Sequence, residues 1–233
     1  PRIIVACESS QTVAKAFHAK GWDVTSVDIL PKDNPSSDVE HIQDDIFTYL
    51  DWAVKNQSID LLIGFPPCTD LSCIGVAHFH NKGFRKFSKR YPSGVVPDSP
   101  MAQGLQFFRK LYYDYRNFIP SICLENPQGV IGTRLPKHSR LWNPINAKGI
   151  SHISYGLKAT QYVQPFQHKC PWSKKTGLWL QNLPPLVPSG IVELDPENDN
   201  WINKLPPTSD RWKIRSKLCQ GFGDAMADQW GDL

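Results

Sequence analysis

A cysteine that follows two prolines is the first residue of this sequence able to carry out covalent chemistry. Cys68 comes after the uncharged run 61–65 and the dipeptide Pro66-Pro67. Such a run is typical of a buried strand, which must stop at the prolines because they cannot continue its hydrogen-bond ladder. Ligands bind at the C-terminal edge of open α/β sheets, so this thiol is well placed to attack a substrate. Taken alone, the segment favours the alternative, a small buried core cysteine.

A carboxylate ends a second, largely apolar run. The segment 119–124 is followed by Glu125, Asn126 and Pro127. If this run is a neighbouring strand, Glu125 emerges at the same sheet edge as Cys68, and a nucleophile and an acid share one pocket. The alternative for Glu125 is a structural carboxylate at a solvated strand end or in a salt bridge. The presence of Cys68 favours the shared pocket.

The two motifs together resemble those of a known enzyme family. Pro66-Pro67-Cys68 and Glu125-Asn126-Pro127 match, in order and at a plausible separation, the Pro-Cys and Glu-Asn motifs of the DNA cytosine-C5 methyltransferases. Over nearly its full length the chain is similar to the small phage- and prophage-encoded members of this family. The further matching stretches are Cys-Glu-Ser-Ser at 7–10, Ser-Lys-Lys-Thr-Gly-Leu-Trp-Leu at 173–180 and Gly-Phe-Gly-Asp-Ala-Met-Ala at 221–227.

The resemblance implies a fold, an activity and an organisation of the chain. The expected fold is an α/β Rossmann-like class I methyltransferase sheet with helices on both faces and a small recognition insertion. The expected activity is transfer of a methyl group from S-adenosylmethionine to C5 of cytosine in double-stranded DNA, with the base flipped out of the duplex. Residues 1–131 form the catalytic and cofactor-binding core, 132–175 the target-recognition insertion and 176–233 the return to the core. Cys68 and Glu125 are the expected catalytic residues.

The first strand, helix and strand of the chain predict a cofactor site. The β-branched run 2–6 leads into a helix that Ser9 or Ser10 can cap and that Gly21 ends, and the next strand ends at Asp28. The helix N-terminus can hold an anionic group, and Asp28 can accept both ribose hydroxyls of a nucleoside cofactor. The loop lacks the Gly-x-Gly-x-x-Gly pattern that lets a pyrophosphate approach. This absence is less damaging to S-adenosylmethionine, which has no phosphates.

The expected cofactor-binding residues come from five segments of the chain. They are Cys7, Glu8, Ser9, Ser10, Asp28, Ile29, Asp45, Ile46, Pro66, Asp224 and Ala225. For Asp45 two interpretations stand level. By resemblance it holds the adenine amino group, and structurally it caps the helix that follows. For Asp28 we favour the cofactor role over a structural one.

Two segments with little periodicity are expected to contact DNA. Residues 71–97 combine basic and aromatic side chains with no acid, and resemble the mobile loop that closes over DNA in the related enzymes. A solvated charged loop is the alternative, and it leaves the aromatic residues unexplained. The insertion is much smaller than in standard members, which predicts short or relaxed sequence selectivity. The expected substrate-binding residues are Pro67, Ser72, Asn126, Arg85, Lys86, Lys174 and Lys175.

The chain departs from the family pattern in ways that leave the substrate open. The Gln-x-Arg-x-Arg segment that supports the base has no clear counterpart, and Lys174, Lys175 or Arg134 are its candidate replacements. Thr69 and Pro127 also replace the usual residues beside the two motifs. The alternatives are therefore transfer of another group to a pyrimidine, action on RNA or a free nucleotide, or an idle nucleic-acid-binding protein. The last would be expected to lack the cysteine or the glutamate.

Composition bounds the remaining expectations. A length of 233 residues with 40% hydrophobic content suits one packed domain plus a modest insertion, and the net charge of +4 is compatible with a polyanionic partner. Six cysteines without recurrent close spacing predict reduced thiols in a cytoplasmic setting, bacterial or phage-infected, and no metal site. No signal peptide or membrane-length apolar run is present, so we expect a soluble protein and a monomer. Helical spacing of apolar residues predicts a core helix over 101–116, and 176–180 a strand.

Overall fold

The structure is a computed structural model of the 233-residue chain. It describes residues 1–72, 100–132 and 157–232, apart from 195, 197, 198, 200 and 209. The predicted DNA-contacting loop with Arg85 and Lys86, and the part of the insertion that contains Arg134, lie outside the described residues.

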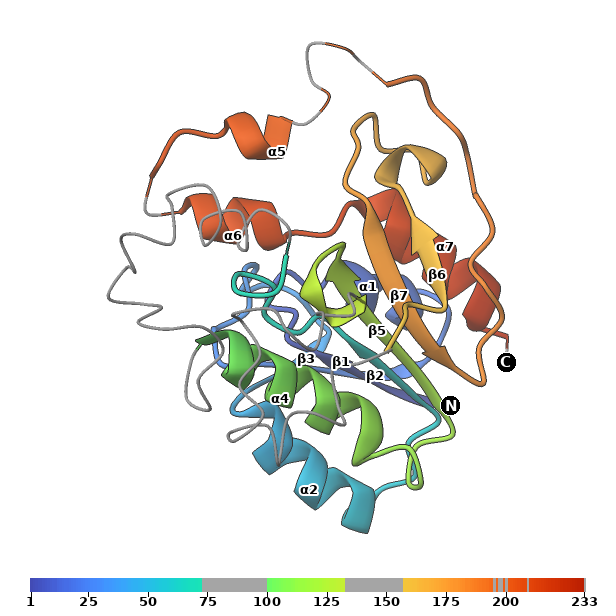
Figure 1. Ribbon diagram of the computed structural model, residues 1–233. Helices are drawn as coiled ribbons and strands as arrows, with labels where there is room; N and C mark the ends of the chain where they lie inside the picture. The colour runs from blue at the N-terminus through green and yellow to red at the C-terminus, as the bar shows by residue number, and fades with distance from the viewer. Residues whose placement is uncertain are drawn as a thin grey trace.

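A single sheet of seven strands forms the centre of the described structure, in the order β3-β2-β1-β4-β5-β7-β6 (Figure 1). Strands β1 to β5 pair in parallel, whereas β7 runs antiparallel to both β5 and β6. The strands are β1 (Arg2–Ala6), β2 (Asp23–Asp28), β3 (Glu40–Gln43), β4 (Leu61–Gly64), β5 (Ser121–Pro127), β6 (Gln161–Val163) and β7 (Thr176–Gln181). This arrangement confirms the Rossmann-like α/β fold expected of a methyltransferase sheet.

Helices cover both faces of the sheet, which explains why its central strands are apolar throughout rather than alternating. On one face, α1 (Thr12–His18) and α7 (Gln220–Trp230) pack side by side. On the other face lie α2 (Ile46–Asn56) and α4 (Pro100–Tyr113) (Figure 1). Two hydrophobic clusters fill the spaces between helices and sheet, with Trp230 in one and Phe108 in the other. Within the described stretches, no helix is both long and apolar enough to cross a lipid bilayer.

Several predicted elements are present with small differences in their bounds. The helix predicted over 101–116 is α4, which ends at Tyr113, and its predicted stripe is buried at Leu105, Phe108 and Leu111. Gly21 has a φ of 84° after α1, a backbone conformation that suits glycine and ends the helix as expected. The strand predicted at 176–180 is β7.

The structure corrects two expectations and refines a third. Cys170 and Cys219 form a disulfide, so the prediction that all the cysteines are reduced is wrong. The two residues are 49 positions apart, a separation that carries no pairing signal in the sequence. The helix cap predicted at Ser9 or Ser10 is also wrong, because neither side chain caps α1. Strand β6, which falls within the expected insertion 132–175, is the edge strand of the central sheet.

The remaining elements are short and belong to the C-terminal segment and its surroundings. Helices α5 (Trp201–Lys204) and α6 (Arg211–Ser216) precede α7. Two 3-10 turns, η1 (Val130–Gly132) and η2 (Pro165–Gln167), follow β5 and β6.

The loops that follow β4 and β5 are held together by a close backbone contact. Ser72 pairs with Gly129 in an isolated antiparallel bridge, and the amides of Leu71 and Ser72 donate to the Cys68 carbonyl at 3.1 and 2.9 Å. A Cβ atom at Gly129 would clash with the Leu71 carbonyl oxygen, because it would lie far inside van der Waals contact distance. Only glycine therefore allows the second loop to support the turn that begins at Cys68.

Replacing Gly129 with alanine should separate these two loops. We expect Gly129→Ala to lower the free energy of unfolding by about 2 kcal/mol, because backbone atoms rather than a flexible side chain must move. Urea denaturation monitored by circular dichroism measures this change. The control is Gly132→Ala, whose new Cβ meets, among the described residues, only the hydroxyl of Tyr162 at 3.2 Å, the end of an exposed side chain. Equal stability of the two variants would contradict the proposed role of Gly129.

Candidate active site

Cys68 and Glu125 lie at the same edge of the sheet because β4 and β5 are parallel neighbours. In their register Gly64, the last residue of β4, faces Leu124, so Glu125 is the first residue of β5 beyond the end of β4. The side-chain amide of Asn126 donates to the carbonyl of Pro66 at 3.0 Å, and this bond joins the two loops. The structure therefore brings together the two residues for which the sequence predicts catalysis.

Glu125 places a buried carboxyl group at this edge of the sheet. Its residue is only 5% exposed, and among the described residues Oε1 has no hydrogen-bond partner. Burial raises the pKa of Glu125, and the Lys174 charge and the Thr176 hydroxyl act in the opposite direction. A protonated carboxyl with an unpartnered oxygen can donate a hydrogen bond to a ring nitrogen. The neighbouring Asn126 Oδ1 is likewise buried and unpartnered among these residues.

Cys68 is a half-buried free thiol under opposing electrostatic influences. Burial raises the pKa of its thiol, as does the Glu125 charge, whereas Lys174 and Arg215 lower it. The thiol is therefore protonated at rest, and nearby cations determine how readily a thiolate forms. Lys174 acts on both Cys68 and Glu125, so this predicted substrate-binding residue belongs to the same site. Arg215 was missed by sequence reasoning.

Glu8 fills the N-terminus of helix α1 with its own carboxylate. Oε1 accepts from the Val13 amide at 2.8 Å and Oε2 from the Ala14 amide at 3.1 Å. Gln11 occupies the cap position in a left-handed conformation and makes no side-chain cap bond. The amide groups that the sequence offered to an external anion are thus already satisfied. This loop therefore suits a cofactor that places no phosphate there.

Asp28 is the last residue of β2, and Ile29 follows it, beside the Glu8 loop. The Asp28 carboxylate accepts from the Leu30 amide at 2.9 Å, and burial raises its pKa against the lowering effect of the Leu30 and Ser9 amides. The next side chain, Ile29, is 69% exposed and presents an apolar surface beside this carboxylate. Burial also raises the pKa of the Cys7 thiol, with further contributions from the charges of Asp28 and Asp45. These predicted cofactor residues therefore share one region.

Other predicted cofactor residues have evident structural roles. Asp45 caps α2, because Oδ1 accepts from the amides of Phe47 and Thr48 at 2.9 and 3.1 Å. Asp45 therefore has the helix-capping role, and adenine binding by Asp45 stays a prediction. Ile46 and Ala225 are buried in the two hydrophobic clusters, so their side chains pack in the core. Pro66 is also buried.

The other residues predicted to bind cofactor or substrate are exposed or contact neighbouring residues of the chain. Asp224 is exposed and accepts from the Gln220 side chain at 2.8 Å. Pro67 is exposed at the mouth of the Cys68 loop, whereas Ser72 is buried in the Gly129 bridge. The Lys175 ammonium lies 4.9 Å from the centre of the Tyr162 ring.

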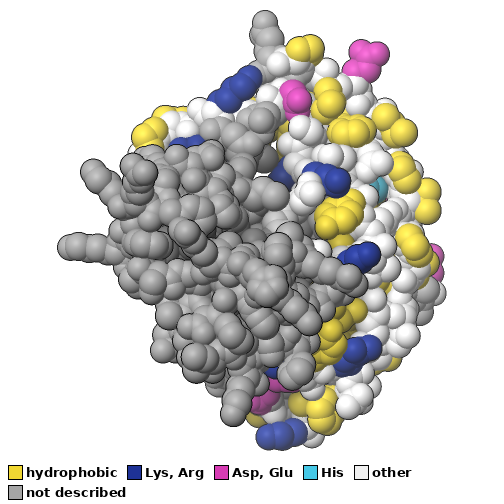
Figure 2. All heavy atoms as spheres, in the orientation of Figure 1, with side chains coloured by type: hydrophobic (Ala, Val, Ile, Leu, Met, Phe, Trp, Pro, Cys, Tyr) yellow, Lys and Arg dark blue, Asp and Glu magenta, His cyan; other side chains and the backbone are white. Residues whose placement is uncertain are grey.

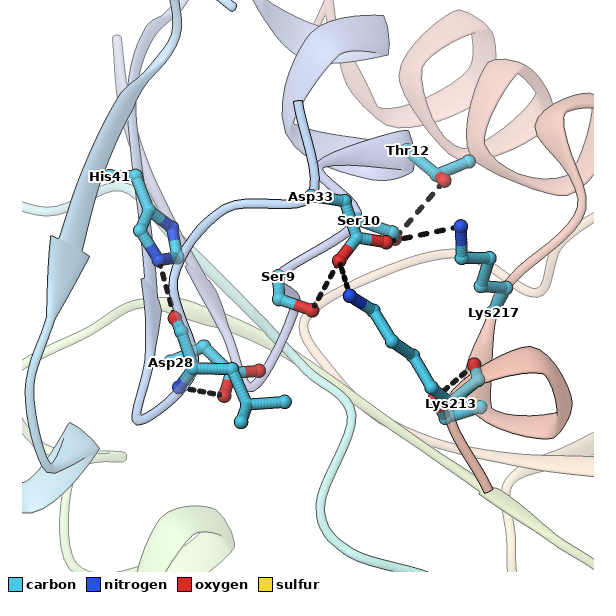
Figure 3. Close-up of polar contacts among 10 residues, drawn as sticks. Ser9, Ser10, Thr12, Asp28, Asp33, His41, Lys213 and Lys217 are labelled. Atoms are coloured by element: carbon cyan, nitrogen blue, oxygen red, sulfur yellow. Dashed lines mark hydrogen bonds and ion pairs between the residues drawn. The ribbon is translucent and has the colours of Figure 1, made fainter. Parts of the chain in front are cut away.

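A carboxylate that the sequence gave no reason to select links the Ser9 loop to helix α6 (Figure 3). Asp33 Oδ1 lies 2.7 Å from the Lys213 ammonium and Oδ2 lies 3.1 Å from that of Lys217. The Ser9 hydroxyl also donates to Asp33 Oδ1 at 3.4 Å, and the Asp33 amide donates to the Ser9 carbonyl at 2.8 Å. The nearby Ser10 hydroxyl contacts Thr12 Oγ1 at 3.2 Å. The four-residue spacing of the two lysines was the one available sequence signal.

A pocket lies between the β6–β7 region and the link from α6 to α7. Its wall includes Thr176, whose hydroxyl interacts with Glu125, and Lys174, whose charge acts on Cys68. Lysine and arginine side chains are spread among hydrophobic ones over the described part of the face shown in Figure 2, with few acids. The lining residues are Val163, Pro165, Trp172, Lys174, Thr176, Lys217, Leu218, Cys219 and Phe222.

Comparison with known proteins finds similar solved structures but no family. No family model and no curated protein matches the chain. One similar structure is a DNA modification methyltransferase encoded within a prophage of E. coli, with 16% identity, a TM-score of 0.44 and coverage of 83% of this chain and 52% of that one. Another is a mutant of DNMT2 from Spodoptera frugiperda, with 13% identity, a TM-score of 0.41 and coverage of 84% and 55%. The chain spans about half the length of these structures, and the fold assignment rests on the strand order and register.

Glu8 should make stability fall as the pH rises. Burial raises its pKa from 4.5 to about 7, against the effect of the α1 amides. A pKa that is raised in the folded state stabilises the protein fully at pH values below the pKa of the unfolded chain. This contribution, here roughly 3 kcal/mol, is lost as the pH rises through the pKa of the folded state. We expect the free energy of unfolding of the wild type, relative to Glu8→Gln, to fall between pH 5 and 8. Urea titrations of both proteins measure the difference, and a difference independent of pH would contradict the raised pKa.

Proposed function

We propose that this chain transfers a methyl group from S-adenosylmethionine to C5 of cytosine in DNA through a transient covalent bond to Cys68. The observation that carries the proposal is the position of the Cys68 thiol beside a buried glutamate, Glu125, that has one unpartnered oxygen. The resemblance of their two sequence motifs to those of the cytosine-C5 methyltransferases supports the same conclusion.

The chemistry explains why both groups are needed. C5 of cytosine is a poor nucleophile, and it gains reactivity when a thiolate forms a bond to C6. The Cys68 thiol first gives its proton to water. The resulting thiolate adds to C6 while protonated Glu125 gives its proton to N3, so the product is a neutral enamine. Burial raises the pKa of Glu125, which favours the protonated form that this step requires. A carboxyl group beside N3 and the exocyclic amine also selects cytosine over thymine.

Release of the enzyme reverses these two steps. S-adenosylmethionine, when bound, supplies the methyl group as an electrophilic sulfonium for attack by C5. The C5 proton then leaves to water, the bond between C6 and Cys68 breaks, and N3 returns its proton to Glu125. The net change is replacement of one C5 proton by a methyl group. Because the site cannot reach a stacked base, the cytosine must be extruded from the duplex.

The residues around Asp28 fit the proposed cofactor. The Asp28 carboxylate can accept the two ribose hydroxyls, and exposed Ile29 offers an apolar surface to adenine. Glu8 already occupies the α1 N-terminus, where a dinucleotide would place its pyrophosphate. A nucleoside cofactor without phosphates meets no such conflict.

A duplex with 5-fluorocytosine at the target position should trap the protein covalently. Fluorine cannot leave C5 as a proton does, so with S-adenosylmethionine the bond to Cys68 persists. We expect intact-mass spectrometry to detect this adduct in the wild type and none in Cys68→Ala. Cys123→Ala is the matched control, because Cys123 is a fully buried free cysteine whose thiol has a strongly raised pKa. An adduct in Cys68→Ala would exclude Cys68 as the nucleophile. An adduct that forms only with RNA or a free nucleotide would exclude DNA as the substrate.

Glu125→Gln should separate catalysis from binding. Glutamine keeps the size of the side chain but has no acidic proton for N3, so we expect single-turnover methylation to slow by roughly 10²- to 10⁴-fold. Labelled methyl transfer to duplex DNA gives the rate, and titration calorimetry gives the dissociation constant of the cofactor. We expect the latter to stay within about threefold. An unchanged rate would exclude Glu125 as the acid.

A further inference from the structure

Two lysines from different elements line the pocket between the β6–β7 region and the α6–α7 link. Lys174 precedes β7, whereas Lys217 follows α6. None of the described residues that line this pocket is acidic. A concave site with two cations and no opposing carboxylate in its lining suits an anionic ligand.

Asp33 holds one of these lysines in place without cancelling the positive charge. Lys213 and Lys217 both contact Asp33, so two ammonium groups share one carboxylate and the cluster keeps a net positive charge (Figure 3). Burial acts to raise the pKa of Asp33, but the two lysines hold it below its ordinary value, so the carboxylate is ionised at neutral pH. The Lys217 ammonium lies on Asp33, and the same residue also lines the pocket.

Aromatic side chains and cross-links give the pocket defined walls. Trp172 packs edge-on against Trp201 with ring centres 5.8 Å apart, and Phe222 lies 5.2 Å from His168. The disulfide from Cys219 to Cys170 joins the start of α7 to the segment after η2. Trp172 is partly exposed and offers aromatic surface beside the two lysines, whereas Phe222 is buried in the core behind it. This combination is the one that nucleic-acid sites use to bind phosphate and to contact bases.

The pocket adjoins the proposed catalytic residues. Thr176 lines it and interacts with the Glu125 carboxyl, and the Lys174 charge acts on both Glu125 and Cys68. A ligand with a phosphate in the pocket would thus have its next group near Glu125.

We propose that this pocket is a phosphate subsite for the DNA strand that carries the target base, with Lys174 and Lys217 as the phosphate-binding residues. Trp172 contacts the adjoining sugar or base. The inference rests on the proposed function, because it takes the strand to be the one whose cytosine reaches Cys68. It adds the residues that position the strand, a task for which the sequence has no Gln-x-Arg-x-Arg segment.

The chain supplies a matched control for each lysine. Lys55 carries the same charge as Lys174, but it lies exposed in the last turn of α2 and does not line the pocket. Lys213 shares Asp33 with Lys217, yet only Lys217 lines the pocket. Within each pair, replacing either lysine with glutamine removes the same charge. In the second pair, either replacement also removes one ion pair with Asp33.

The test measures binding of a fluorescent cytosine-containing duplex by anisotropy between 50 and 300 mM salt. We expect Lys174→Gln and Lys217→Gln each to reduce the slope of log K against log salt by about 0.9, the value for one phosphate contact. Each should also weaken binding about three- to tenfold at 150 mM salt, whereas Lys55→Gln and Lys213→Gln stay near wild type. Thermal melts check that all four variants fold.

The outcomes separate this subsite from the proposed reaction. If each pocket lysine behaves like its matched control, or if the wild type does not bind the duplex, the subsite is overturned. If methylation of cytosine is absent but the pocket variants alone lose the salt slope, the proposed function fails and the phosphate site stands. If methylation occurs while the pairs behave alike, only the subsite fails.

Discussion

The parallel pairing of β4 with β5 is the constraint on which the candidate site depends. Both strands are buried on both faces, which fixes their register through packing as well as hydrogen bonds. Pro66 cannot extend the ladder, so the chain must turn at this level. Because Gly64 faces Leu124, the turn and the end of β5 meet, and the bond from Asn126 to the Pro66 carbonyl closes the contact. Cys68 and Glu125 are neighbours as a consequence of backbone geometry.

Burial sets the chemical state of this neighbourhood. Desolvation raises the pKa of both Cys68 and Glu125, so the resting site avoids two adjacent negative charges in a poorly solvated space. Lys174 opposes both shifts from the wall of the neighbouring pocket. A site of this kind holds its protons until a ligand alters the balance of charge. That property suits a reaction in which one group must lose a proton while its neighbour supplies one.

The C-terminal segment connects the Ser9 loop to the pocket beside the candidate active site. Its Lys213 and Lys217 form ion pairs with Asp33 beside the Ser9 loop. Its Lys217 and Phe222 form part of one wall of the pocket. Helix α7 then packs against α1, and the Trp22 indole donates to the Gly231 carbonyl at 2.8 Å. The last elements of the chain therefore position the first loop. The disulfide to Cys170 adds a covalent link on the pocket side.

Local patterns in the sequence determined the parts of this protein that depend on single strands and turns. The apolar runs that end at Pro66 and Glu125 predicted that both residues reach one sheet edge, and the strand ending at Asp28 predicted the first Rossmann-like unit. Such patterns succeed because periodicity and proline act over a few residues. For Asp45 the local pattern allowed two interpretations, and the structure contains the bonds of one of them, the helix cap.

The tertiary structure alone decided the contacts between distant segments. Nothing near Asp33 signals that lysines about 180 positions later will bind it, and nothing near Cys170 signals its bond to Cys219. Glu8 was selected as a cofactor residue, yet its position as the anion at the α1 N-terminus depends on a left-handed Gln11 that turns the helix back onto it. These arrangements follow from how helices pack on the sheet. Packing is a property of the whole fold, so residue types and spacing did not reveal it.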